Sequence, residues 1–516
     1  MDDRATVRRA LAADTRETFD RRVAEQAAVL RAAIRDGDFD GAGFAIGLEV
    51  ECYAVDGAGR LTTLPDTLFG APGRTREIGR HNVELNSTPH PFDPEGVAAQ
   101  ATELGAAIDN LRADAAAVDA DCRIITDGMW TIPPNEGSQA YLGTITEDDE
   151  IIVADNMQPK PRYHAIDNAL VDHADGSIRL AVPGMDASFP TILVESLTTS
   201  IQPHLQIPEA STFPPYFNAA IRTLGPVLAL ATNSPFLPGD LYDLDADGVI
   251  DDPAELVAAT PHELRVPVFE ATVNSAGYQK AGCPADIDAA TDIIDRVVDD
   301  WTCGPFLQEW EADGEGDPYW EFRHKYGTYW RWVRGIVGGD ASGGGEPDLT
   351  TAGALRIEYR PLPTQPTVAD ILALHWLVVG LLRGIVAADH PLTELPWSDA
   401  RESFYNAVDD GLDAELHWVT ADGEQTTDHD VIYGEVFDLA ERGLREQGLS
   451  EGDATDRIGP IRARWKQEAT PSQWKKDRVR EELNGGKSLA TAIESMQRDY
   501  YELSRNGEPF AEWNCR

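Results

Sequence analysis

Polar and apolar residues alternate in four short segments of the chain, where polar side chains recur at every second position inside apolar runs. The segments cover residues 47–51, 82–86, 202–206 and 356–360. A spacing of two places side chains on the same face of a β-strand. Each segment therefore predicts a strand with one polar face. Four such strands in one sheet would gather carboxylates, an imidazole and guanidinium groups on a concave face that suits divalent cations and phosphates better than a hydrophobic core.

The rest of the pattern predicts helices and strands in irregular succession. We expect helices over 5–36, 95–120, 216–232, 286–312, 367–387 and most of 430–516, and strands over 44–55, 61–64, 82–88, 123–126, 197–207 and 354–360. The first two strands should form a hairpin through a glycine-containing turn at 56–59. Residues 127–190 predict active-site loops, and 338–348 a flexible loop. Because helices and strands do not alternate regularly, we expect an α+β fold, an antiparallel sheet backed by helices.

Composition and charge narrow the class of protein. The chain has 516 residues, 42 % of them hydrophobic, which is enough for a large core and two or three domain-sized units. Its 89 acidic and 43 basic residues give a net charge of −46, spread along the chain. We interpret this charge as adaptation to a high-salt cytoplasm, with a functional acidic surface as the alternative. No basic stripe is present to neutralise phosphates, so a nucleic-acid partner is not expected.

Cysteine spacing and hydropathy indicate a cytoplasmic protein without a membrane partner. The five cysteines show no CxxC spacing, which argues against a zinc site and a disulfide framework. We expect Cys52 to be a small buried hydrophobe. The first residues contain no apolar signal-peptide segment. The most apolar stretch, 371–386, contains His375 and Arg383 and is too short to span a bilayer comfortably, so it predicts a buried helix.

Glu49 and Glu51 share one face of the first polar segment, which Phe44 and Tyr53 flank. The flanking residues favour a strand buried on both sides, while a strand with a charged solvent face is the structural alternative. Two buried carboxylates on one face repel each other unless a cation lies between them. Mg²⁺ or Mn²⁺ is the natural partner for such oxygen ligands and commonly bridges substrate phosphates.

The other three segments each allow a structural and a functional interpretation. Glu84 lies in a strand that ends at a proline turn. His204, between two glutamines, is either a structural histidine or part of a polar site. Glu358, between two arginines, belongs either to a surface ion-pair ladder or to a metal site beside a guanidinium that binds phosphate with two hydrogen bonds.

Three other motifs have weaker support. Residues 484–488 are similar to the end of a P-loop, but position 481 is Glu instead of Gly and no strand precedes it. Asp243, Asp245 and Asp247 begin a segment like a calcium-binding EF-hand loop, but the twelfth position is Ala254, so a structural cation there stays open. Neither Gly-x-Ser-x-Gly nor His-Glu-x-x-His is present, which removes support for a serine hydrolase or a zincin.

Taken in order, the polar segments resemble the glutamate–cysteine ligase type 2 (carboxylate–amine ligase) family. The most specific part is Tyr-Trp-Arg-Trp-Val-Arg at 329–334, followed some twenty residues later by the segment 356–370; 83–86, 200–206 and 230–236 add to it. The resemblance covers about 40–420, with a weaker match in the helical C-terminal part. It predicts an N-terminal helix over 1–40, a catalytic domain over 41–420 and a helical region over 421–516 that packs on it.

The resemblance implies a fold of the glutamine-synthetase type, in which a curved antiparallel sheet forms a half-barrel funnel. ATP enters one side and the amino acid the other. The γ-carboxylate of glutamate attacks the γ-phosphate of ATP to give γ-glutamyl phosphate and ADP, and the amine of cysteine then displaces phosphate. Mg²⁺ and ATP are the implied cofactor and co-substrate.

The resemblance also implies roles for residues of this chain. Arg360 would hold the γ-phosphate or the acyl phosphate, and other arginines would hold substrate carboxylates or the nucleotide. The expected catalytic residues are Arg360, Arg334 and Arg331; the expected cofactor-binding residues are Arg265, Gln202, Gln206 and Asn86; and the expected metal ligands are Glu49, Glu51, Glu84, His204 and Glu358.

Two departures leave alternatives open. Many family members carry other polar residues in place of Gln202 and Gln206, and this chain is longer than the compact members. The accepting amine therefore stays open between cysteine and another amino acid or a polyamine, and a non-catalytic nucleotide-binding relative is the third alternative. Whether the chain forms a homo-oligomer is also open.

Overall fold

The computed structural model describes residues 3–515, except 42, 149, 245–249, 251, 276, 311–316 and 339–353. Most of the predicted loop 338–348 therefore lies outside the described residues, as do Asp245 and Asp247 of the EF-hand-like segment.

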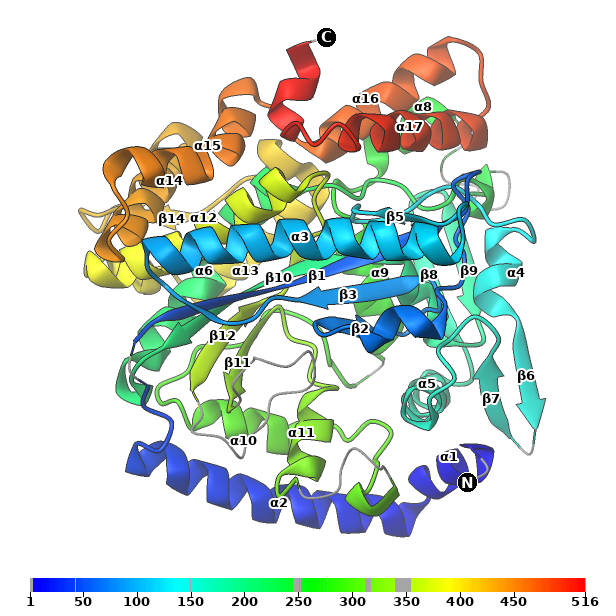
Figure 1. Ribbon diagram of the computed structural model, residues 1–516, viewed down its shortest axis with the longest axis horizontal. Helices are drawn as coiled ribbons and strands as arrows, with labels where there is room; N and C mark the ends of the chain where they lie inside the picture. Colours follow the sequence, from blue (N-terminus) through cyan, green and yellow to red (C-terminus); the bar gives the residue numbers. More distant parts are fainter. Residues whose placement is uncertain are drawn as a thin grey trace.

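A large antiparallel sheet runs through the molecule (Figure 1). Its main path follows the order β11-β12-β10-β1-β3-β2, which are Val333–Val337, Leu355–Tyr359, Ser200–Ile207, Ala45–Val55, Asn82–Asn86 and Arg74–Arg76. β13 (Leu362–Pro363) pairs with β10, and β4 (His90–Pro91) and β5 (Arg123–Ile125) pair with β1. The predicted antiparallel sheet backed by helices is confirmed, and the half-barrel shape stays a prediction.

The register of the sheet aligns the polar positions of the predicted segments. His204 lies opposite both Gly47 and Glu358, Glu49 lies opposite Gln202 and Asn86, and Glu51 lies opposite Glu84. Three polar rows therefore cross the sheet: Arg334–Glu358–His204–Gly47, Gln202–Glu49–Asn86 and Glu51–Glu84–Thr75. Segments that are far apart in the sequence thus share one polar face.

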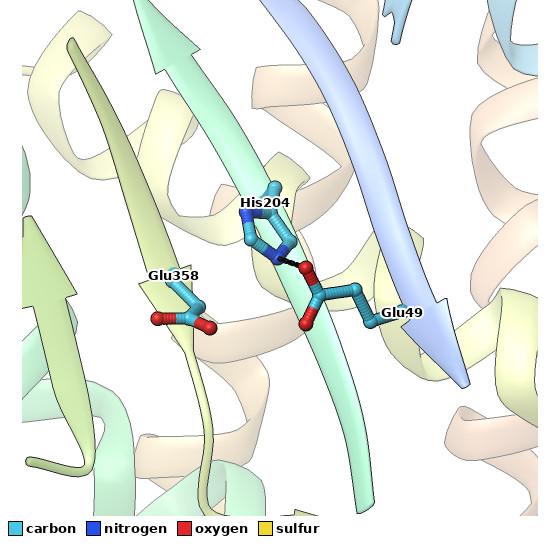
Figure 2. A group of neighbouring side chains, drawn as sticks. All are labelled: Glu49, His204 and Glu358. Carbon is cyan, nitrogen blue, oxygen red and sulfur yellow. Dashed lines mark ion pairs between the residues drawn. The ribbon is translucent and has the colours of Figure 1, made fainter. Parts of the chain in front are cut away.

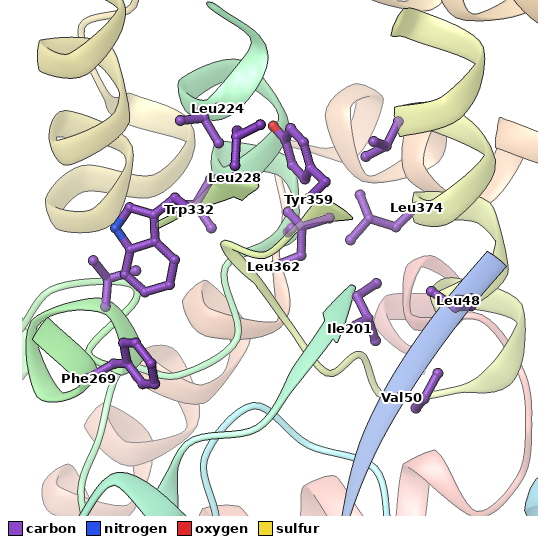
Figure 3. Packing of buried hydrophobic residues seen from close by; sticks show 14 of the residues in the cluster. Leu48, Val50, Ile201, Leu224, Leu228, Phe269, Trp332, Tyr359, Leu362 and Leu374 are labelled. Atoms are coloured by element: carbon purple, nitrogen blue, oxygen red, sulfur yellow. The ribbon is translucent and has the colours of Figure 1, made fainter. Parts of the chain in front are cut away.

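The opposite face of the same strands is apolar. Leu48, Val50 and Ile201 are at most 1 % exposed and join the main hydrophobic core with Leu374 (Figure 3). Three helices pack on these strands: α3 (Pro94–Val118), α6 (Phe213–Ala231) and α12 (Val368–Ala387). Burial of each such side chain contributes about 1.5–3 kcal/mol, so the apolar layer holds the sheet while its other face stays polar.

Other helices lie on the polar side of the sheet or between the layers. In Figure 1, α2 (Ala13–Asp36), α5 (Pro161–His173), α10 (Asp292–Asp299) and α11 (Trp320–Tyr326) lie on the polar side. The remaining elements are α1 (Asp3–Ala10), α4 (Ser138–Gly143), α8 (Pro253–Ala259), α9 (Arg265–Val273), α13 (Trp397–Asp410), and the hairpins β6–β7 (Ile145–Asp148, Ile151–Ala154), β8–β9 (Ile178–Val182, Met185–Phe189) and β14–β15 (Trp418–Val419, Gln425–Thr426).

The structure corrects several boundaries expected from sequence. The helix expected over 5–36 is divided into α1 and α2. The helix expected over 286–312 is reduced to α10, which ends where Asp300 adopts an extended conformation, and a 3₁₀ helix at Gln308–Trp310; residues 311 and 312 lie outside the described residues. The strand expected at 61–64 is reduced to one bridge between Val55 and Leu61. The region 127–190 contains two short helices and two hairpins instead of loops alone.

The C-terminal part is helical, as predicted, and packs on the rest of the molecule. It consists of α14 (His429–Glu446), α15 (Glu451–Gln467), α16 (Pro471–Asn484) and α17 (Leu489–Ser504). α14 and α15 pack on α12, which is the one described helix long and apolar enough to cross a membrane. Because 83 % of its most apolar window is buried, α12 is the buried helix that the sequence predicts.

Backbone contact between α12 and α14 generates a stability prediction. A Cβ atom added at Gly443 would lie 1.9 Å from the carbonyl oxygen of Gly380, whereas one added at Gly434, also in α14, would meet nothing within 4 Å. We expect Gly443→Ala to lower the free energy of unfolding by about 1–3 kcal/mol through overpacking. Gly434→Ala should raise it by about 0.5–1 kcal/mol through helix propensity. Denaturant unfolding in molar KCl measures both, and equal effects of the two variants would contradict the packing.

Candidate active site

A cavity of about 680 Å³ opens on the polar face of the sheet. Its wall combines strand residues with residues of α5, α9 and α11, so both layers of the fold contribute. Nine of the twelve residues predicted to form the site line it: Glu49, Glu51, Glu84, Asn86, Gln202, Arg265, Arg334, Glu358 and Arg360. The cavity therefore gathers most of the polar groups selected by their two-residue spacing.

Glu49, His204 and Glu358 point toward one another from β1, β10 and β12 (Figure 2). One ligand atom from each lies within 4.8 Å of the others, and Glu49 Oε1 is 3.2 Å from His204 Nε2. Two carboxylates and an imidazole form a donor set that a divalent cation accepts. His204 is not among the lining residues, but this geometry places its ring beside Glu49.

Guanidinium groups surround Glu358, which is 1 % exposed. Arg334 donates to both carboxylate oxygens, with NH2 2.8 Å from Oε1, and Arg360 NH1 lies 2.9 Å from Oε1. Burial alone would raise the pKa of Glu358, but the two guanidiniums hold it well below its usual range. Glu358 is therefore ionised across the physiological pH range, as a metal ligand must be.

Carboxylates crowd the other part of the cavity. Burial, with the charges of Glu49 and Glu51, raises the pKa of Glu84 to about 8. Burial and the Glu51 charge likewise raise the pKa of Glu195 to about 8, and the pKa of Glu77 lies well above its usual value for the same kind of reason. A bound cation would relieve this mutual repulsion. The raised pKa values are therefore a second reason, besides the Glu49–His204–Glu358 geometry, to expect a cation in the cavity.

Hydrogen bonds fix the orientation of the acidic cluster. Glu51 accepts from the Ser200 backbone N–H at 2.7 Å, from the Ser200 hydroxyl at 3.0 Å and from Gln202 Nε2 at 3.0 Å. Glu84 accepts from Thr75 Oγ1 at 2.8 Å and from Asn86 Nδ2 at 2.8 Å. Asn86 and Gln202, predicted to bind the cofactor, thus hold carboxylates in place.

Sequence reasoning missed Glu77 and Glu195, although both line the cavity. Glu77 follows Thr75 at the same two-residue spacing, so the alternation of β2 continues through it. β2 spans only three residues, which made that signal too short to notice. Glu195 lies in a 3₁₀ helix, Ile192–Leu197, where no strand periodicity exists.

Besides His204, two predicted site residues do not line the cavity. Arg331 donates to the Gln279 carbonyl oxygen, and Gln206 Nε2 lies 3.2 Å from the Gly43 carbonyl oxygen. Arg265 does line it, at 3 % exposed, with its guanidinium donating to the Pro361 carbonyl oxygen. The geometry supports a site role for Arg265 and gives none to Arg331 or Gln206.

A family model described as glutamate–cysteine ligase family 2 matches residues 45–495. The chain belongs to this family. Glutamate–cysteine ligase family 2 is a family of carboxylate–amine ligases. A search of curated proteins gave no match for this family member.

Solved structures with distant similarity are also ligases by their descriptions. A bifunctional glutathione synthetase from Pasteurella multocida has a TM-score of 0.48 and 13 % sequence identity. The match covers 93 % of this chain and 55 % of the synthetase chain. A glutamate–cysteine ligase from Francisella tularensis in complex with AMP has a TM-score of 0.44 and 12 % sequence identity, and the match covers 92 % of this chain and 91 % of the ligase chain. The ligase PafA in complex with the ubiquitin-like protein Pup has a TM-score of 0.35 and 10 % sequence identity, and the match covers 88 % of this chain and 72 % of the other chain.

The acidic cluster predicts how stability depends on pH in the absence of cations. The pKa values of Glu84 and Glu195, about 8, lie above the 4.5 of an exposed glutamate, so the folded state binds these protons more tightly than the unfolded chain. Their stabilising contribution is fully present below pH 4.5 and is lost as the pH rises through 8. The free energy of unfolding should fall by up to about 1.4 kcal/mol per pH unit for each group.

Chemical denaturation at pH 5–8 with a chelator measures this dependence. Added Mg²⁺ should flatten it, and so should Glu84→Gln. The exposed Glu25, which pairs with Arg21 on the surface of α2, supplies a control: Glu25→Gln should leave the dependence unchanged. Buried histidines such as His81, with a lowered pKa of about 4, act in the opposite direction, so equal slopes in the chelated wild type and Glu84→Gln are the result that would contradict the assignment.

Proposed function

We propose that the protein is an ATP-dependent ligase that joins the γ-carboxylate of glutamate to an amine through γ-glutamyl phosphate, with cysteine as the acceptor and ADP and phosphate as the other products. The observation that carries the proposal is the cavity itself. It places an acidic cluster beside guanidiniums on one rigid sheet, and the chemistry needs both kinds of charge.

Neutralisation of charge is the main requirement of this reaction. A carboxylate attacks a polyanionic triphosphate poorly unless the developing charge is compensated. A divalent cation, which we propose to be Mg²⁺, would supply that compensation when bound by Glu49, His204 and Glu358. Glu51 and Glu84 would hold a second cation close to the phosphates. These carboxylates come from a sheet that is packed on its other face, so they keep their geometry during the reaction.

The arginines supply positive charge that needs no cofactor. Arg334 is fixed by its two hydrogen bonds to Glu358, so its role is to orient that carboxylate. Arg360 donates from Nη1 to Gln202 and Glu358 and lines the cavity. A guanidinium placed in this way can bind the transferring phosphoryl group and then the acyl phosphate.

The choice of cysteine as the acceptor is the most specific part of the proposal, and it rests on membership of the glutamate–cysteine ligase family. Phe269, Trp330 and Trp332 form an apolar part of the cavity wall, which would accept a small amino acid side chain. Another amine acceptor is the alternative within the same chemistry, and a non-catalytic nucleotide-binding relative is the alternative outside it. We also retain as proposals the cytoplasmic, high-salt setting and the domain boundaries at 40 and 420.

An ADP-release assay tests the proposal. Purified protein with glutamate, cysteine, ATP and Mg²⁺ in molar KCl should release ADP and form γ-glutamylcysteine, and omission of either amino acid or addition of chelator should stop ADP release. A screen of amino acids and polyamines in place of cysteine decides the acceptor. ADP release that needs no amine, or none with any acceptor, would refute the ligase proposal.

Two arginines of neighbouring segments give a matched test of the site. Arg360→Met should lower kcat by about 10²–10³-fold, because a preorganised cation at the transferring phosphoryl group is lost. Arg331→Met removes the same charge outside the cavity, from a side chain that contacts Gln279 and the ring of Tyr329, and should leave kcat close to wild type. Equal losses in both variants would contradict the assignment of Arg360.

A further inference from the structure

A buried ammonium group joins the C-terminal helices to the sheet at a point remote from the cavity lining. Lys475 of α16 is 1 % exposed, and its Nζ atom lies 2.6 Å from Asp127 Oδ1 and 2.8 Å from the Asn233 carbonyl oxygen. The ring of Tyr500 in α17 lies 4.2 Å from the same nitrogen. Gln497, also in α17, donates to the other oxygen of Asp127 at 2.7 Å. Both C-terminal helices therefore converge on Asp127.

A first series of hydrogen bonds leads from the Lys475–Asp127 pair to Glu51; we call it the first path. The Thr199 hydroxyl donates to the carbonyl oxygen of Asp127, and the Thr199 N–H donates to Gly128 at 3.1 Å. The next residue, Ser200, donates its N–H to Glu51 Oε2 at 2.7 Å, and both Ser200 and Glu51 line the cavity. Asp127 thus holds the segment that orients a candidate metal ligand.

The second path leads to Arg265. The Asn233 N–H donates to Glu263 Oε2 at 2.9 Å, and Arg265 Nε lies 3.3 Å from Glu263 Oε1. Glu263 is fully buried. Arg265 lines the cavity and donates to the carbonyl oxygen of Pro361, the residue after Arg360. The hydrogen bonds of this path join side chains that are at most 3 % exposed, so we expect displacement at one end to be transmitted to the other.

We propose that Lys475 is a positioning residue of the active site, which fixes Glu51 through Asp127 and Arg265 through Asn233. The C-terminal helices are then part of the catalytic unit and not an accessory layer. The kinetic test of this inference rests on the proposed ligase function. The inference also gives the Asn-Ser pair at 233–234, which does not line the cavity, a role in positioning Arg265.

A buried arginine elsewhere in the molecule provides a matched control. Arg222 of α6 is 3 % exposed and, like Lys475, bonds one carboxylate, that of Asp286, and one carbonyl oxygen, that of Leu395. Neither Arg222 nor these partners line the cavity. Arg222→Met therefore removes a buried cation of the same kind without touching either path.

The experiment compares Lys475→Met, the double variant Asp127→Asn with Lys475→Met, and Arg222→Met. The double variant leaves no unpaired carboxylate, which keeps the test open if the single variant fails to fold. We expect kcat to fall by about tenfold to a hundredfold in the double variant, with KM for ATP changed far less. Arg222→Met should keep kcat when both are measured well below their unfolding midpoints.

Amide hydrogen exchange of peptides spanning 198–202 and 263–267 supplies a reading that does not depend on activity. Exchange should accelerate in both peptides of the double variant and in neither peptide of Arg222→Met. Unchanged exchange, or a kcat that recovers along with stability in the double variant, would overturn the positioning role. A wild type inactive with every acceptor would refute the ligase proposal instead, and the exchange data would still decide the role of Lys475.

Discussion

Repulsion among carboxylates is the constraint on which the site depends. Glu51, Glu77, Glu84 and Glu195 line one cavity, where burial raises the pKa of each, and neighbouring carboxylate charges raise the pKa values of Glu77, Glu84 and Glu195 further. A fold keeps such groups together only if other interactions outweigh the repulsion. Here the apolar face of the same strands, covered by α3, α6 and α12, provides them. The polar face is thus maintained by the hydrophobic layer behind it.

The carboxylates of the cavity differ in how their negative charge is compensated. Around Glu358, guanidiniums already compensate the carboxylate, and its pKa is low. Around Glu84, hydrogen bonds come from Thr75 and Asn86, no guanidinium among the described residues bonds the carboxylate, and its pKa is high. The demand for an external cation is therefore greater at the acidic cluster than at the Glu49–His204–Glu358 group. At neutral pH Glu84 is largely protonated, so a cation that binds there has to displace its proton.

The sequence was most informative where side-chain geometry is set by local periodicity. Strand alternation placed Glu49, Glu84, His204 and Glu358 on one face, and the register confirms it. Arg334 lies in β11, whereas Arg331 precedes that strand, so strand alternation does not determine where Arg331 points. Glu195 was beyond reach, since its position depends on how a 3₁₀ helix packs against α9, which no local pattern reports.

The bonds that join the C-terminal helices to the core are of the kind that salt does not weaken. The pairs Arg464–Asp370 and Lys475–Asp127 are at most 1 % exposed, whereas pairs such as Arg505–Glu502 are largely in solvent. At molar salt the Debye length is about 3 Å, so exposed pairs are screened and buried ones are not. In the high-salt cytoplasm that we propose for this acidic chain, alignment of the helices with the active site must come from buried polar contacts. The placement of Lys475 and Arg464 meets that requirement, and it ties the cavity to helices that contribute no residue to its lining.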